Sequence, residues 1–193
     1  MNTNQVFFMG PDDRSGYPSI DFSRPENRHY DWLSVAEMIE GTREPNAQAL
    51  SSINIKVVTQ MRQFDCLSFN AHLLVSDSAK AILESLAPGD CQFTSLHVNE
   101  RPFSLLLPTK ILNVLDRPKS ELVFLPNNPN LVMRITRYRF QKRVIPDPSL
   151  FRIPENKIRV FVTDTVERVV RNSGLVGFQF IDFENPPPNV QVS

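Results

Sequence analysis

The sequence predicts an α+β protein with short helices on mostly antiparallel strands. Apolar runs of strand length recur along the chain, as at residues 103–107 and 131–140. Two segments, 72–96 and 159–183, share one strand–helix–strand pattern. Most of the 16 prolines lie between these elements, where they interrupt regular structure. We therefore expect a single domain over residues 1–184 and a flexible tail over residues 185–193.

The N-terminal third contains three predicted elements. Residues 6–9 are apolar and precede a Gly-Pro pair, which predicts a short strand that ends in a turn. Ser34 followed by Glu37 forms a capping box, so a helix is predicted near residues 34–40. Apolar and polar residues alternate over residues 53–58, which predicts another strand.

The two strand–helix–strand segments align with each other without a gap, which predicts two related units in one domain. In each unit a Ser/Thr-Asp pair follows the first strand, and these side chains can accept hydrogen bonds from free N–H groups of the next helix. The predicted caps are Ser76, Asp77, Thr163 and Asp164. The glycines at 89, 174 and 177 follow the helices and can take left-handed conformations.

Composition excludes several classes of protein. The chain has 193 residues, of which 41% are hydrophobic and 22% charged, as in soluble globular proteins. It has no apolar stretch of membrane-spanning length and no secretory signal, so we expect a cytoplasmic protein without a membrane partner. Lys plus Arg and Asp plus Glu each total 21, but the first hundred residues are acidic and residues 101–150 are basic. The zero net charge therefore leaves room for electrostatic attraction to a partner.

The sequence contains no recognisable catalytic or metal-binding motif. It lacks a Gly-rich phosphate loop, a His-Glu-x-x-His motif and a paired Cys-x-x-Cys motif, and we predict no metal and no cofactor. Cys66 and Cys91 are expected to be buried, but a Cys–His nucleophilic pair stays open because such residues need only meet in space. No catalytic residue is predicted.

The strongest charge cluster is basic and includes interleaved aromatic residues. One interpretation is a solvated strand whose charges discourage edge pairing, which we favour. Nucleic-acid binding is less favoured, and docking onto an acidic protein partner stays open. As candidate partner-binding residues the cluster supplies Arg134, Arg137, Arg139, Lys142 and Arg143.

The order of several motifs resembles family eleven of the bacterial polymorphic-toxin immunity proteins over about residues 64–183. The motifs are Leu-Leu-Val-Ser-Asp from Leu73, Leu-Asn-Val-Leu-Asp from Leu112, Leu-Phe-Arg-Ile from Leu150, Val-Phe-Val-Thr-Asp from Val160, and Gly-Leu-x-Gly-Phe-x-Phe from Gly174. The resemblance implies a small cytoplasmic α+β protein without catalysis that binds and neutralises a cognate toxin. The alternative is a small-ligand-binding protein or enzyme with a cleft between the two repeat lobes. The sequence leaves the oligomeric state and the identity of the toxin open.

Overall fold

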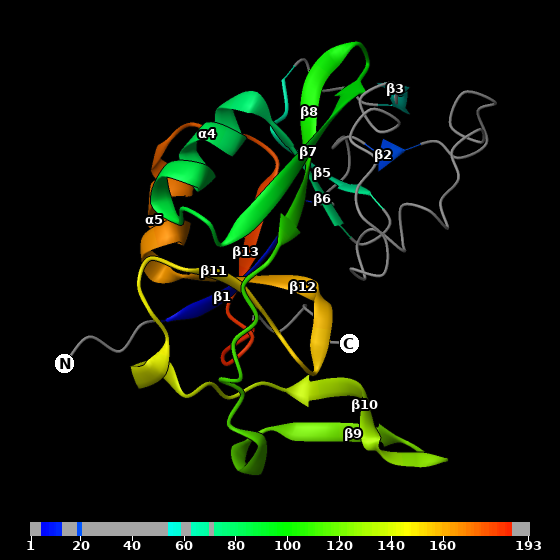
Figure 1. The fold of residues 1–193 in the computed structure, drawn as a ribbon, viewed down its shortest axis with the longest axis vertical. Coiled ribbons are helices and arrows are strands. Elements are labelled where there is room, and N and C mark those ends of the chain that lie inside the picture. The colour runs from blue at the N-terminus through cyan, green and yellow to red at the C-terminus, as the bar shows by residue number, and fades with distance from the viewer. Residues whose placement is uncertain (1–4, 13–18, 21–53, 59–62, 70–71, 187–193) are drawn as a thin grey trace.

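Two β-sheets and two short α-helices form most of the described protein (Figure 1). The structure is a computed structural model, and it describes residues 5–12, 19–20, 54–58, 63–69 and 72–186. Among the described strands, only β3 (Asn54–Ile55) and β7 (Cys91–Val98) pair in parallel. All other strand pairings are antiparallel, which confirms the predicted α+β class.

The larger sheet has five strands in the order β3-β7-β8-β6-β5. Its three further strands are β8 (Arg101–Pro108), β6 (His72–Ser76) and β5 (Cys66–Phe69). The central strand β8 runs antiparallel to both β6 and β7. A separate two-stranded pairing joins β2 (Ser19–Ile20) to β4 (Val57–Val58).

The second sheet has four strands in the order β11-β12-β1-β13. These strands are β11 (Leu150–Ile153), β12 (Asn156–Thr163), β1 (Val6–Pro11) and β13 (Phe178–Ile181). The predicted N-terminal strand therefore forms, and it lies between two strands from the far end of the chain. Phe8 pairs with Phe161 on one side and with Ile181 on the other.

The two predicted strand–helix–strand segments are β6-α4-β7 and β12-α5-β13, with α4 at Asp77–Leu86 and α5 at Asp164–Asn172. In each, the two strands run parallel with a third, antiparallel strand between them: β8 in the first and β1 in the second. The two segments thus share one arrangement of elements. Their relation by an internal repeat stays a prediction.

The two helices begin differently, although each has a Ser or Thr at its N-cap. Ser76 Oγ accepts a hydrogen bond from Ala79 N–H at 3.3 Å, as expected for a capping serine. Thr163 makes no such bond, because its Oγ accepts from Ser149 N–H at 3.1 Å. Asp77 is exposed in the first turn of α4, and Asp164 Oδ1 is buried without a hydrogen-bond partner among the described residues. The predicted capping role of Thr163 is therefore replaced by a contact to the start of β11.

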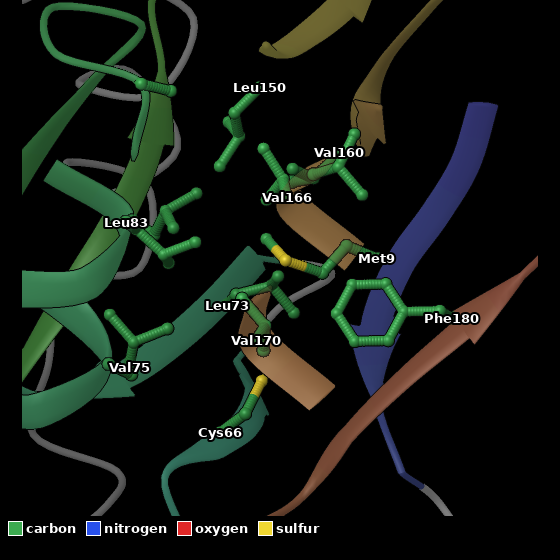
Figure 2. Close-up of a cluster of buried hydrophobic side chains, with 14 residues drawn as sticks. Met9, Cys66, Leu73, Val75, Leu83, Leu150, Val160, Val166, Val170 and Phe180 are labelled. Atoms are coloured by element: carbon green, nitrogen blue, oxygen red, sulfur yellow. The ribbon is translucent and has the colours of Figure 1, made fainter. Parts of the chain in front are cut away.

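Three apolar clusters form the core. One lies between the two sheets, and one lies on the outer face of each sheet. The middle cluster takes residues from both sheets and both helices, including Met9, Leu83, Val166 and Phe180 (Figure 2). The outer face of the five-stranded sheet carries a second cluster around Phe103. The third cluster lies on the other side of β1 and β12 and is rich in aromatic rings.

The segment between the sheets differs from the predicted strands. Residues 111–115 make only isolated bridges, through Ile111 and Leu115. The predicted strand over 131–140 is instead the second arm of a hairpin, β9 (Glu121–Leu125) with β10 (Asn128–Arg137), preceded by the short helix η1 (Arg117–Lys119). After β10 the chain leaves the extended conformation because Tyr138 and Phe140 insert into the aromatic cluster, and the short helix η2 (Lys142–Val144) follows. The predicted helix at 34–40 and residues 187–193 of the predicted tail lie outside the described residues.

Candidate functional site

The predicted basic cluster is divided between an exposed part and a part bound internally. Arg134 and Arg137 lie on β10 and are exposed, and Arg143 is exposed in η2. Arg137 Nη1 lies 3.5 Å from Glu121 Oε1 across the hairpin, whereas Arg134 pairs in register with Val123, which carries no charge. The five basic residues therefore do not form one continuous stripe.

Arg139 and Lys142 both bind Glu184, near the C-terminal end of the described chain, Lys142 through its carboxylate and Arg139 through its backbone carbonyl. The Glu184 side chain is only 9% exposed, and its Oε2 forms an ion pair with Lys142 Nζ. Its Oε1 accepts from Phe140 N–H at 3.0 Å, and its backbone carbonyl accepts from Arg139 Nη1 at 2.7 Å. Because these contacts fix the segment after β10 to the aromatic cluster, Arg139 and Lys142 have structural roles.

A group of exposed apolar side chains lies beside the basic residues, and it was not predicted from the sequence. We call Phe124, Leu125, Leu131 and Met133 the hairpin tip, since they lie near the turn that joins β9 to β10. Their exposed fractions range from 37% at Leu125 to 53% at Met133. The signal was present in the sequence as apolar residues on both sides of the Pro-Asn-Asn-Pro turn, but alternation alone does not show which apolar residues are buried.

Neither cysteine has the environment of a nucleophile. Burial, and then the charge of Asp65, raises the pKa of the Cys66 thiol far above its ordinary value. Burial, followed by Asp90 and Glu84, raises the pKa of Cys91 to about 12. Both thiols therefore stay protonated near neutral pH, whereas the thiolate is the reactive species. No disulfide joins the two.

His72, at the start of β6, is separated from both thiols. Cys66 pairs with Val75 and Phe69 pairs with His72, so Cys66 and His72 lie three strand positions apart, about 10 Å. Strand β8 separates β6, which carries His72, from β7, which carries Cys91. Burial and the charge of Arg152 lower the pKa of His72 to about 4. The structure does not form the Cys–His pair that the sequence left open at these positions.

The buried carboxylates of Asp65 and Asp90 make contacts that join different parts of the chain. Asp65 Oδ1 accepts from Ser76 Oγ at 2.7 Å, and its Oδ2 accepts from Val176 N–H at 2.9 Å. Asp90 pairs with Lys110 Nζ at 2.9 Å and accepts from Leu150 N–H at 3.0 Å. Asp65 thus connects the two strand–helix–strand segments, and Asp90 connects the first segment to β11. The bonds occupy the acceptor atoms that an acid–base role would need.

The described residues carry neither a metal-binding cluster nor a membrane-spanning helix. They contain no group of three or more His, Cys, Asp or Glu side chains placed to hold a metal ion. No helix among them has both the length and the apolar composition needed to cross a membrane.

Comparison with known families identifies the chain. Residues 45–185, well over half of its length, match the sequence model of the immunity protein family Imm11. The chain belongs to the Imm11 immunity protein family. The match includes the five-stranded sheet, the hairpin, both helices and most of the four-stranded sheet. The expected resemblance is thereby confirmed, and Imm11 membership gives the chain a toxin-neutralising immunity role. The chain matches no curated protein sequence.

Proposed function

We propose that this Imm11 protein is a non-catalytic cytoplasmic protein that binds and neutralises a cognate bacterial toxin. The observation that carries this proposal is the family match over residues 45–185, which spans nearly all of the described secondary structure. The match thus covers most of the fold rather than a short motif. This is expected for a protein that binds its partner through a folded surface.

The chemistry of the described side chains favours binding over turnover. The thiols of Cys66 and Cys91 have raised pKa values, and the buried carboxylates of Asp65 and Asp90 accept hydrogen bonds within the fold. The side chains that a partner can contact lie on the surface instead. We therefore infer that the toxin is blocked by occlusion rather than altered by a reaction.

The candidate partner-binding residues narrow to those that are exposed. Arg134, Arg137 and Arg143 remain candidates for contact with an acidic surface. The alternative docking surface is the acidic first hundred residues, which suits a basic toxin and about half of which lies outside the described part of the chain. Charge complementarity would determine which surface is used and how fast the partners associate.

A co-expression experiment tests the proposed function. The toxin encoded beside this gene is expressed alone, with this protein, and with a destabilised variant of this protein as the control. We expect survival only with the intact protein. Continued killing at equal expression levels contradicts the proposal.

A titration with purified components then separates binding from catalysis. We expect inhibition of the toxin to become complete near an equimolar ratio, with the toxin's mass unchanged and its activity recovered after the complex is dissociated. Complete inhibition by a small fraction of one equivalent, or a changed toxin mass, contradicts the non-catalytic role.

A further inference from the structure

The hairpin exposes more large apolar side chains than any other element of the described structure. Seven large hydrophobic residues are exposed in the described part of the chain, and the four residues of the hairpin tip are among them. Single exposed apolar residues are normal, but several together on one element are typical of an interaction site. Figure 1 shows the hairpin below both sheets, where a partner can approach it.

The base of the hairpin is anchored, so the hairpin tip is presented in a defined position. Leu122, Val132 and Ile135 pack against the aromatic cluster of the core. Thr136 Oγ donates to the Glu121 carbonyl at 3.3 Å, across the two strands. In the described chain β9 and β10 pair only with each other, which leaves one edge of each strand open. A fixed apolar surface loses little conformational entropy when a partner covers it.

One charged residue at the hairpin tip determines the chemistry that a partner needs. Arg134 follows Met133, is exposed, and lies opposite Val123. Val123 and Leu125 are two positions apart on β9, so Arg134 lies on the same face of the hairpin as Leu125. A partner that covers this face also removes water from the Arg134 guanidinium. An unpaired buried charge is costly, and a carboxylate can pair with a guanidinium through two hydrogen bonds. The complementary surface is therefore apolar with an acidic residue at its edge.

Resting on the proposed function, we propose that the hairpin tip and Arg134 form the surface that docks onto an apolar, acid-edged patch of the cognate toxin. A second copy of this chain is a poorer occupant. Two hairpins placed face to face bring together four arginines, from Arg134 and Arg137 of each copy, and only two glutamates, from Glu121. Opposite charges on the toxin give attraction where a homodimer gives repulsion.

The test measures the affinity of the purified protein for the cognate toxin by calorimetry. Met133→Ser and Leu131→Ser each remove an exposed apolar contact, and we expect the dissociation constant to rise about tenfold or more for each, as for interface anchors. Arg134→Glu is expected to raise it about 100-fold at low salt and less at high salt, because it places like charges together. Ile158→Ser is the matched control, since Ile158 is 54% exposed on β12 outside the hairpin, and it should leave the affinity unchanged.

The outcomes distinguish this inference from the proposed function. If the wild-type protein does not bind the toxin, the proposed function itself is wrong. If the wild type binds and the three hairpin variants bind equally well, the toxin docks elsewhere and only this inference is overturned. A concentration-dependent dimer that Met133→Ser abolishes, or salt-sensitive binding to random oligonucleotides that Arg134→Glu abolishes, also overturns it. Equal unfolding midpoints for all four variants show that altered affinity does not reflect loss of the fold.

Discussion

Gly177 lies where the second strand–helix–strand segment approaches strand β5 of the five-stranded sheet, and replacing it should destabilise the protein. Its φ angle is +96°, a value that residues with a side chain rarely adopt. A Cβ atom added at this position would lie 2.8 Å from the carbonyl oxygen of Cys66, which is backbone and cannot rotate away. Gly177 also accepts a hydrogen bond from Asp12 N–H at 2.9 Å, so the loop is held on two sides.

The expected cost of Gly177→Ala has two separable parts. A non-glycine residue at positive φ costs on the order of 1–3 kcal/mol. Forcing extra volume into a packed contact adds roughly 1–3 kcal/mol. Gly174→Ala isolates the first part, because Gly174 has a φ of +78° but nothing within 4 Å of an added Cβ. The free energy of unfolding should therefore fall by about 2–6 kcal/mol for Gly177→Ala and by only about 1–3 kcal/mol for Gly174→Ala.

Denaturant unfolding of the wild type and the two variants measures this difference. Equal m-values would show that the change lies in stability rather than in the compactness of the unfolded state. If Gly177→Ala and Gly174→Ala lose the same amount of stability, the close approach to Cys66 has no energetic importance. A Gly177→Ala variant as stable as the wild type refutes both parts of the reasoning.

Two further predictions concern buried polar groups. Lys110→Met leaves the Asp90 carboxylate, 11% exposed, without its cation, and should cost between about 1 and 5 kcal/mol in denaturant unfolding, the range from exposed to buried pairs. Lys119→Met, at a 74% exposed side chain, is the control and should cost about 1 kcal/mol or less; equal losses for the two variants contradict the reasoning. Because burial lowers the pKa of His72 from 6.5 to about 4, the unfolded state binds more protons between these values, so stability should fall as pH drops from about 6.5 to about 4. His72→Gln should flatten this slope in unfolding measured across pH, with exposed His97→Gln controlling for loss of a histidine; an unchanged slope in His72→Gln shows that another group is responsible.

Local patterns predicted the elements whose geometry depends on nearby residues. The apolar run before Gly10 forms strand β1, and Ser76 caps the N-terminus of helix α4. Gly89, Gly174 and Gly177 all adopt positive φ angles, as their places after the helices predicted. These outcomes follow from hydrogen bonds and steric limits within a few residues, which sequence shows directly.

Patterns that depend on distant partners were predicted less well. Thr163 has the sequence context of a capping residue, but its hydroxyl accepts from the Ser149 N–H because β11 lies beside it. Arg139 and Lys142 belong to the most basic segment, but Glu184, more than 40 residues away, engages both. A charge run in sequence does not show which charges will meet a carboxylate in the fold.

The sequence by itself determined the fold class, the two strand–helix–strand segments and the immunity family, because strand periodicity, helix-start residues and the order of motifs are local and linear properties. Only the tertiary structure decided which side chains stay exposed. Leu122 and Leu125 lie on the same short strand, but Leu122 packs against the core and Leu125 remains 37% exposed. That difference arises from where the hairpin lies relative to the aromatic cluster, and this placement is made by contacts between distant parts of the chain. The proposed toxin-docking surface follows from this placement.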